Sequence, residues 1–425
     1  MLSSFSAKKF RNLNIEHLKL NKLNVFVGPN NSGKSNLIDA ISFISEIVKF
    51  EKDQAYPTAF WSELNKRAWG SLLDRQSEKP ATIELNWILQ DGQNRPLQYD
   101  FCFRIPESGT EASDYRITKE RLADVEPRKG HDQPYEYFSC HSHQQGKGYF
   151  SARSRTEGKQ SAAKRPGIAV SPFDSVMNQL EQLLNHEKFR TEYYPNFKKS
   201  LERVKQFFED FRAYSSTKFD LLQIRGGELQ PSFLTHLKQD GSNLASLLEL
   251  LEKKYPGFLS EYAGYLRELI PDLQNIMVDV SGGLYRKTIR LQISNHLFAL
   301  NEVSDGTIKA MLLAVLLWTP QKFTLLSLDE PELNIHPAWL KVISNWITRS
   351  GSSEQVMIST HSPDFLDGLT PLFRSGELNV YRFSLNKPMP MIEQIELSEF
   401  EPYFQEGWEL GDIYRTGKLG GWPWL

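Results

Sequence analysis

Residues 28–35 read Gly-Pro-Asn-Asn-Ser-Gly-Lys-Ser, a complete G-x-x-x-x-G-K-[ST] phosphate loop. An apolar run from Leu23 to Val27 precedes this loop, and apolar residues at helical spacing follow it from Leu37 to Ile44. The order of strand, loop and helix is the one that the motif requires, because backbone N–H groups and the positive end of the helix then face one anion. The segment therefore predicts an α/β fold that binds a polyphosphate.

The side chains of the loop have separate expected roles. Gly28 and Gly33 let the backbone curl around the phosphates. Lys34 is expected to reach the β- and γ-phosphates, and the hydroxyl of Ser35 is expected to coordinate Mg²⁺. The expected nucleotide contacts are Gly28, Pro29, Asn30, Asn31, Ser32, Gly33, Lys34, Ser35 and Asn36.

A second apolar run, Phe323 to Leu328, is followed directly by Asp329-Glu330-Pro331-Glu332. In open α/β sheets the ligand binds beyond the carboxyl ends of the strands, so these acids are expected beside the phosphate loop. Asp329 is placed to hold the Mg²⁺ shell, and Glu330 is placed to orient or deprotonate an attacking water. Taken alone, the run also fits a strand followed by an acidic helix cap, but the phosphate loop favours the functional interpretation.

Two further segments carry polar residues next to a predicted strand or helix, where they could contact a nucleotide. His361 follows a predicted strand from Gln355 to Thr360 and is expected to hydrogen-bond the γ-phosphate at the same sheet edge. Residues 304–307, Ser-Asp-Gly-Thr, precede an apolar helix from Ile308 to Trp318, and by themselves predict only a capped core helix.

Composition limits the class of protein. The chain has 425 residues, of which 40% are hydrophobic and 24% charged, which is typical of a globular protein. Lys and Arg number 50 against 52 Asp and Glu, so any contact with nucleic acid must come from a local patch. The two cysteines cannot form a disulfide framework or a four-ligand zinc site, which suits a reducing cytoplasm. No apolar run approaches the roughly 20 residues of a membrane span.

The segments GPNNSGKSN (28–36), VSDGT (303–307), LSLDEPE (326–332) and STHSPD (359–364) together resemble the ABC-type ATPase heads of SMC, recombination-repair and OLD-like proteins. The resemblance is closest to AAA-labelled prokaryotic anti-phage ATPases without a Toprim domain. It implies an α/β P-loop head with a mostly parallel core sheet, an antiparallel β subdomain and an inserted helical lobe. It also implies ATP and Mg²⁺ as cofactors, and hydrolysis with Glu330, His361 and Lys34 as catalytic residues.

The same resemblance assigns Ser304, Asp305 and Gly306 to the signature motif, which contacts the γ-phosphate bound by another subunit. A homodimer through ATP, or a higher oligomer, is thereby implied. This chain has Asp305 where the common LSGGQ form has glycine. Gln54 and Gln76 are both candidates for the glutamine-loop residue, and the sequence does not choose between them.

We expect five segments along the chain. They are the N-terminal part of the head (1–126), a mobile basic loop (127–170), a helical lobe with strands (171–300), the C-terminal part of the head (301–396) and a docking tail (397–425). The basic residues Lys147, Arg153, Arg155, Lys159, Lys164 and Arg165 fit either a solvated loop or a contact with a DNA or RNA backbone. The aromatic tail fits either a partner contact or ordinary packing.

The function implied is an ATPase that dimerises on ATP and switches or drives a prokaryotic anti-phage complex. Only 64 residues follow His361, too few for a Toprim domain, so a nuclease or toxin effector is expected on a separate protein. Two alternatives remain open: a recombination-repair ATPase that clamps duplex DNA, and a nucleotide-gated scaffold that hydrolyses slowly. Single-turnover kinetics and ATP-dependent DNA binding would distinguish them.

Overall fold

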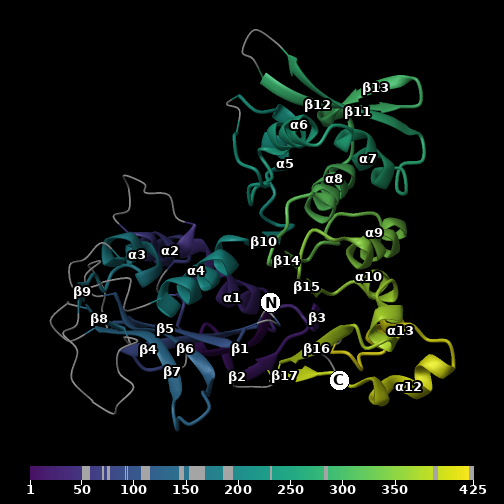
Figure 1. Ribbon diagram of the computed structural model, residues 1–425. Helices are drawn as coiled ribbons and strands as arrows, with labels where there is room; N and C mark the ends of the chain where they lie inside the picture. The colour runs from purple at the N-terminus through teal and green to yellow at the C-terminus, as the bar shows by residue number, and fades with distance from the viewer. Residues whose placement is uncertain are drawn as a thin grey trace. The chain divides into compact units, whose positions relative to one another are not determined.

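The computed structural model describes residues 1–49, 58–68, 71–73, 77–90, 92, 94–106, 115–142, 148–152, 168–184, 195–229, 232–281, 286–385 and 391–420. The chain forms two compact units (Figure 1). Unit 1 comprises Met1–Asn21, Gly33–Arg212 and Leu385–Ile392, and unit 2 comprises Lys22–Ser32, Ala213–Ser384 and Glu393–Leu425. Within the described ranges, no helix has the length and apolar character needed to cross a bilayer.

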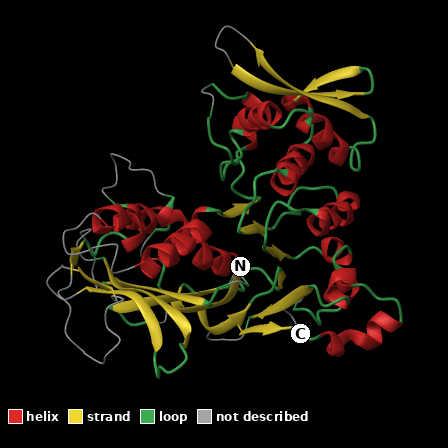
Figure 2. Ribbon diagram, in the orientation of Figure 1, coloured by secondary structure: helices red, strands yellow, loops and turns green. Residues whose placement is uncertain are grey.

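Unit 1 is built on an eight-stranded antiparallel sheet. Its elements are β1 (Leu2–Phe10), β2 (Leu13–Lys19), α1 (Lys34–Val48), α2 (Ala59–Lys66), β4 (Ala81–Leu89), β5 (Leu97–Ile105), β6 (Arg116–Pro127), β7 (Pro134–Ser142), β8 (Gly148–Ala152), β9 (Ile168–Val170), α3 (Val176–Leu184) and α4 (Pro195–Glu209). The strand order is β2-β1-β4-β5-β6-β7-β8-β9. Helices α1 to α4 lie on one face of this sheet (Figures 1 and 2).

Buried and more exposed side chains alternate along the strands of unit 1, which explains why helices cover only one face of the sheet. In β4 the side chains of Ile83, Leu85 and Trp87 are buried, and the residues between them are more exposed. The helix α1 packs on this face, where the rings of Phe43 and Phe103 stack with their centroids 5.2 Å apart. The indole N–H of Trp87 also donates a 3.1 Å hydrogen bond to the Ile41 carbonyl of α1.

The described part of segment 127–170 differs from the loop that we expected. Strands β7, β8 and β9 extend the antiparallel sheet there, and Phe138 of β7 is fully buried. Its many Gly, Ser, Gln and His residues predicted a loop, but pairing with β6 supplies the backbone hydrogen bonds of β7. All six basic residues named above lie outside the described residues.

Unit 2 contains the parallel strands. Its elements are β3 (Leu23–Val27), β10 (Phe211–Ser215), α5 (Leu221–Gly226), α6 (Leu244–Lys254), α7 (Phe258–Leu266), β11 (Leu273–Ser281), β12 (Arg286–Ile293), β13 (His296–Ala299), α8 (Asp305–Trp318), β14 (Leu325–Asp329), α9 (Pro337–Arg349), β15 (Val356–Thr360), α10 (Pro363–Asp367), α11 (Thr370–Arg374), β16 (Leu378–Ser384), β17 (Met391–Gln394), α12 (Leu397–Gln405) and α13 (Leu410–Arg415). Along the chain, β10 and β17 cross the division between the units.

The six-stranded sheet has the order β10-β14-β15-β3-β16-β17. Strands β14, β15, β3 and β16 are mutually parallel. Every residue of β3 and β15 is buried, which explains why both strands read as nearly continuous apolar runs. Parallel pairing brings the carboxyl ends of these strands to one edge of the sheet.

A second, three-stranded sheet of unit 2 has the order β11-β12-β13. Helices α6 and α7 lie against it in the same part of the unit (Figures 1 and 2). All residues of α8 from Thr307 to Leu317 are buried, so this helix is a core element with no solvent-facing stripe over that length.

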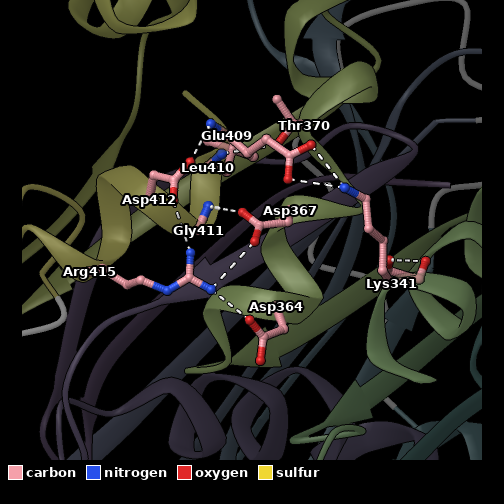
Figure 3. A network of polar contacts seen from close by, with 10 residues as sticks. Lys341, Asp364, Asp367, Thr370, Glu409, Leu410, Gly411, Asp412 and Arg415 are labelled. Atoms are coloured by element: carbon pink, nitrogen blue, oxygen red, sulfur yellow. Dashed lines mark hydrogen bonds and ion pairs between the residues drawn. The ribbon is translucent and has the colours of Figure 1, made fainter. Parts of the chain in front are cut away.

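Helix α13 of unit 2 packs on α10, the helix that follows β15. The Gly411 N–H at the start of α13 donates a 2.8 Å hydrogen bond to Asp367 of α10 (Figure 3). Arg415 of α13 contacts Asp364 of α10 at 2.6 Å and Asp412 at 3.0 Å. Whether the tail also docks a partner stays a prediction.

Candidate nucleotide site

The loop that follows β3 requires glycine at its first position. Gly28 has a φ of 147°, and a Cβ there would overlap the Phe383 carbonyl oxygen on the neighbouring strand β16. Asn31 adopts the left-handed conformation with a φ of 63°, and the Ser32 N–H donates a 3.3 Å hydrogen bond to the Pro29 carbonyl. The backbone of the loop is therefore tightly curled, as the motif predicts.

The loop continues into unit 1, where α1 begins at Lys34. Gly33 is the N-cap with a φ of 103°, and it provides no side-chain cap for the helix. A Cβ on Gly33 would lie 3.0 Å from Oδ1 of Asn12. A helix that starts without a side-chain cap or an acid in its first turn suits an anion at its positive end.

The turn between β1 and β2 braces the first turns of α1. Asn36 donates a 2.7 Å hydrogen bond to Asn12, and Arg11 donates one of 2.7 Å to Asn36. Arg11 and Arg67 both pair with Asp39 at 2.8 Å. Nothing in the local sequence of Arg11 and Asn12 indicates that they hold this helix.

The carboxyl ends of β14 and β15 deliver the expected acids and histidine of unit 2. Asp329 is paired with Ser359 in the sheet register, and Thr360 is paired with Val27, the last residue of β3. Asp329, His361 and Gly28 therefore occupy adjacent strand ends at one edge. Ser359 donates a short hydrogen bond to Asp329 Oδ1, and Ser215 donates one of 3.2 Å to Oδ2. These bonds fix the orientation of the carboxylate.

Glu330 adopts an unusual backbone conformation directly after β14. Its φ is 51°, in the left-handed region that non-glycine residues rarely occupy. Its N–H donates a 3.0 Å hydrogen bond to the Ser359 carbonyl, which holds the turn against β15. The Glu330 Oε1 atom lies 3.7 Å from Nε2 of His361, and both side chains remain partly exposed. An acid and a histidine thus face one another at the strand ends.

Glu332 takes part in this arrangement, although the sequence gave it no role. Its Oε1 accepts hydrogen bonds from the Thr360 hydroxyl at 2.7 Å and from the His361 N–H at 3.0 Å. Burial raises the pKa of this carboxyl, and the two hydrogen bonds oppose the shift. The sequence signal for this role was the third acid of Asp-Glu-Pro-Glu, whose carboxylate bonds Thr360 at the end of β15 in the structure.

The signature segment forms the start of α8. The Ser304 hydroxyl accepts a 3.1 Å hydrogen bond from the Thr307 N–H and so caps the helix. A Cβ on Gly306 would lie 3.0 Å from the Asn334 carbonyl oxygen, a spacing that leaves little room for a side chain. Asp305 pairs with Arg225 of α5 at 2.6 Å.

A buried lysine links the signature helix to the segment after the acidic strand end. Lys309 of α8 donates a 2.9 Å hydrogen bond from Nζ to the Leu333 carbonyl. Burial lowers the pKa of this amine. Helix α8, which Ser304 caps, is therefore tied to the turn that carries Glu330 and Glu332.

The structure brings some of the expected site residues together and leaves others as predictions. Gly28 to Ser32, Asp329, Glu330, His361 and the signature residues Ser304 to Gly306 all belong to unit 2. Gly33, Lys34, Ser35 and Asn36 belong to unit 1 and are joined to the first group by chain continuity. That Lys34 and Ser35 meet Asp329 around one nucleotide stays a prediction. Gln54 and Gln76 lie outside the described residues.

In unit 2, parallel strands lead into a phosphate loop, an acidic pair and a histidine at one edge of the sheet. A capped helix belongs to the same unit. This combination defines the ABC-type class of P-loop ATPases. Residues 23–367 match the family described as "AAA domain, putative AbiEii toxin, Type IV TA system". The chain belongs to this family. The resemblance proposed from the four motifs is confirmed, and membership implies a P-loop ATPase that binds ATP.

Solved structures support the fold. The chain is similar to an SMC head bound to the C-winged helix domain of ScpA, with a TM-score of 0.50, 13% identity and coverage of 94% of this chain and 99% of that chain. The expected α/β fold with a mostly parallel sheet and an antiparallel sheet is confirmed by this match. No curated protein matches the chain.

Two further SMC heads are similar at lower scores. One is the SMC head domain from Thermotoga maritima, with a TM-score of 0.40, 12% identity and coverage of 93% of this chain and 99% of that chain. The other is an SMC head with an extended coiled coil, bound to the C-terminal domain of ScpA derived from Pyrococcus furiosus, with a TM-score of 0.45, 12% identity and coverage of 95% and 98%.

Proposed function

We propose that this ATPase binds ATP with Mg²⁺, closes as a head-to-tail homodimer around the nucleotide, and reopens after hydrolysis. One observation carries the proposal: Asp329, Glu330 and His361 lie at the same sheet edge as Gly28, where the phosphate loop begins. A triphosphate bound by the loop would therefore extend toward an acidic pair and a histidine.

The oxygen ligands of this site suit Mg²⁺. The Asp329 carboxylate is held by Ser359 and Ser215, and the Ser35 hydroxyl is the second ligand that the loop motif supplies. Mg²⁺ would neutralise charge on the β- and γ-phosphates, and Lys34 would add a positive charge there.

Glu330 is the proposed general base. The Glu330 carboxylate lies 3.7 Å from Nε2 of His361, whereas the Asp329 carboxylate is held by Ser359 and Ser215, so the two acids can serve different ligands. Glu330 would accept a proton from the attacking water, and His361 would hydrogen-bond the γ-phosphate as it leaves. The products of this step are ADP and phosphate.

The signature residues would act on a second copy of the chain. Ser304 and Asp305 are exposed at the start of α8, whereas the missing Cβ of Gly306 would face the Asn334 carbonyl of the same chain. The positive end of this 14-residue helix would then face the γ-phosphate held by the partner subunit.

Two substitutions test the chemistry. Lys34→Ala should weaken ATP binding about tenfold or more, because a charge-assisted contact is lost. Glu330→Gln should keep ATP binding, lower turnover about 100-fold and trap the closed dimer. Glu354→Gln, a change at an exposed glutamate of the same unit, is the matched control and should leave both unchanged. Equal rates of ATP hydrolysis by wild type and Glu330→Gln would show that Glu330 is not the general base.

Mixed dimers test action between subunits. A dimer of one Lys34→Ala chain and one Ser304→Ala chain should retain at most one intact composite site. If each substitution impaired only the nucleotide bound by its own chain, the signature would act within its own subunit.

We also propose a cytoplasmic prokaryotic anti-phage complex as the setting, with the effector, a nuclease or toxin, on a separate protein. The family description, which names a toxin and a Type IV TA system, supports this setting. Co-purification of the native complex should yield a second protein with effector activity. Intrinsic nuclease activity of this chain, abolished by a site substitution, would contradict the assignment. ATP-dependent DNA binding with a steep salt dependence would instead favour a DNA clamp.

A further inference from the structure

Asp305 has a specific cationic partner that is distant in the sequence. Nη2 of Arg225 donates a 2.6 Å hydrogen bond to Asp305 Oδ1 and one of 2.9 Å to the Val303 carbonyl. Both acceptors flank Ser304, the cap of α8. A single guanidinium therefore braces the segment that the proposed function directs toward the partner's nucleotide.

The local fold holds Arg225 in place. Asp220 caps α5 by accepting a 2.9 Å hydrogen bond from the Gln223 N–H. After α5, Glu228 forms a β-bridge with Lys287 of β12, and both of its backbone bonds are 2.9 Å long. The short helix is thus anchored at both ends, and the Arg225 side chain is presented from a fixed backbone.

The charge of Asp305 creates a problem for the proposed dimer. A carboxylate at the second signature position would repel the triphosphate of the partner subunit, and the repulsion would strengthen as closure excluded water. In the separate chain the pair contributes little to folding, because the Asp305 side chain is 53% exposed and the Arg225 side chain 22% exposed. The pair of Arg225 and Asp305 is therefore expected to matter mainly when a second chain covers this surface.

We infer that Arg225 is a positioning residue of the signature: its guanidinium neutralises Asp305, so that the start of α8 can approach the triphosphate bound by a second copy of this chain. This inference rests on the proposed function. The pair replaces, with two opposite charges, the uncharged glycine found in the common signature form. Asp305 and the Val303 carbonyl then keep the Arg225 side chain next to the segment that Ser304 occupies.

A purely structural role of Arg225 would give different experimental results. If Arg225 only tied α5 to α8, its loss would lower thermal stability, and removing the charge of Asp305 would not restore function. If Arg225 compensates charge, its loss should impair ATP-dependent dimerisation, and Asp305→Asn should rescue that loss because the uncompensated charge disappears.

The test uses the full chain with Glu330→Gln as the parent and measures dimerisation by analytical ultracentrifugation with ATP and Mg²⁺. Added to this parent, Arg225→Gln should weaken the dimer about tenfold or more. The combination of Arg225→Gln with Asp305→Asn should recover most of the parent affinity. Arg349→Gln, which breaks the 2.9 Å pair of Arg349 with Glu268 elsewhere in unit 2, is the matched control and should have no effect.

The possible outcomes test the proposed function and the inference about Arg225 separately. A parent that fails to dimerise with ATP would contradict the proposed function and this inference with it. A parent that dimerises, with Arg225→Gln equally tight or with no rescue by Asp305→Asn, would overturn this inference alone. ATP affinity of the monomer, measured in parallel, should be the same in all variants, because Arg225 acts on the partner's nucleotide.

Discussion

The backbone N–H of His361 donates a 3.0 Å hydrogen bond to Oε1 of Glu332, and the same oxygen accepts the Thr360 hydroxyl at 2.7 Å. The Glu332 carboxylate therefore fixes the backbone at the end of β15, where His361 follows Thr360. Glu332 is buried and does not replace Glu330 as an acid of the strand-end site.

Glu332→Ala should lower turnover about tenfold and reduce the free energy of unfolding by about 1–3 kcal/mol, because the buried Thr360 hydroxyl and the partly buried His361 N–H lose their acceptor. ATP affinity should change little. Glu332→Gln keeps an acceptor oxygen and should retain most activity. Steady-state kinetics and thermal unfolding check both variants, and equal impairment in the two would mean that the negative charge itself is required.

Gly28→Ala should distort the phosphate loop. Its φ of 147° disfavours a side chain, and the new Cβ would overlap the Phe383 carbonyl. We expect a loss of about 1–3 kcal/mol of stability together with weaker ATP binding, measured by calorimetry. Gly226→Ala, where the structure places no atom within 4 Å of the new Cβ, is the control and should bind ATP normally. Normal ATP binding by Gly28→Ala would contradict the described loop conformation.

Unit 1 should lose stability as the pH rises from 4.5 to about 7. Burial raises the pKa of Glu120 from 4.5 to about 7, despite hydrogen bonds from Val176, Tyr99 and Ser175. The folded state therefore holds the Glu120 proton more tightly than the unfolded state, so the contribution of Glu120 to stability is greatest below pH 4.5 and is lost as the pH rises through 7. The expected loss is on the order of 3 kcal/mol.

Hydrogen exchange of amides in β5 and β6, followed between pH 4.5 and 8 and corrected for intrinsic rates, measures this loss. Glu120→Gln removes the titrating group and should give a flatter pH dependence. An unchanged slope in that variant would assign the effect to other groups.

Gly411→Ala should separate α13 from α10. A Cβ on Gly411 would overlap Oδ1 of Asp367 and the Pro363 carbonyl oxygen, so the contacts in Figure 3 could not all be kept. We expect faster hydrogen exchange in α10, which begins just after His361, and lower thermal stability. Gly264→Ala is the control, since the nearest atom to its Cβ, Nη1 of Arg267, lies 3.8 Å away. Equal protection of α10 in both variants would contradict close packing at Gly411.

Local patterns were sufficient for much of the fold. Continuous apolar runs predicted β3, β14 and β15, because strands buried on both faces have no polar alternation. Residues 304–307 predicted a Ser, Asp or Thr cap before a helix from Ile308 to Trp318, and in the structure Ser304 is the cap and α8 begins at Asp305. The rule that parallel strands end at one edge then predicted that Asp329 and His361 would lie close together, as they do within unit 2.

Other features depended on contacts that no local pattern contains. Arg225 pairs with Asp305 across 80 positions of sequence, and nothing near either residue indicates the pairing. The left-handed turn at Glu330 is stabilised by Ser359 from the neighbouring strand, against the preference of glutamate itself. Strands β7 to β9 were missed because their pairing with a neighbouring strand outweighs a loop-like composition.

The most direct test of the central claim is the structure of the Glu330→Gln protein bound to ATP and Mg²⁺. The account predicts one triphosphate contacted by Lys34, Ser35, Asp329 and His361 of one chain and by Ser304 of a second chain. ATP bound by Lys34 with Asp329 and His361 remote from its phosphates, or bound without a second chain, would contradict it.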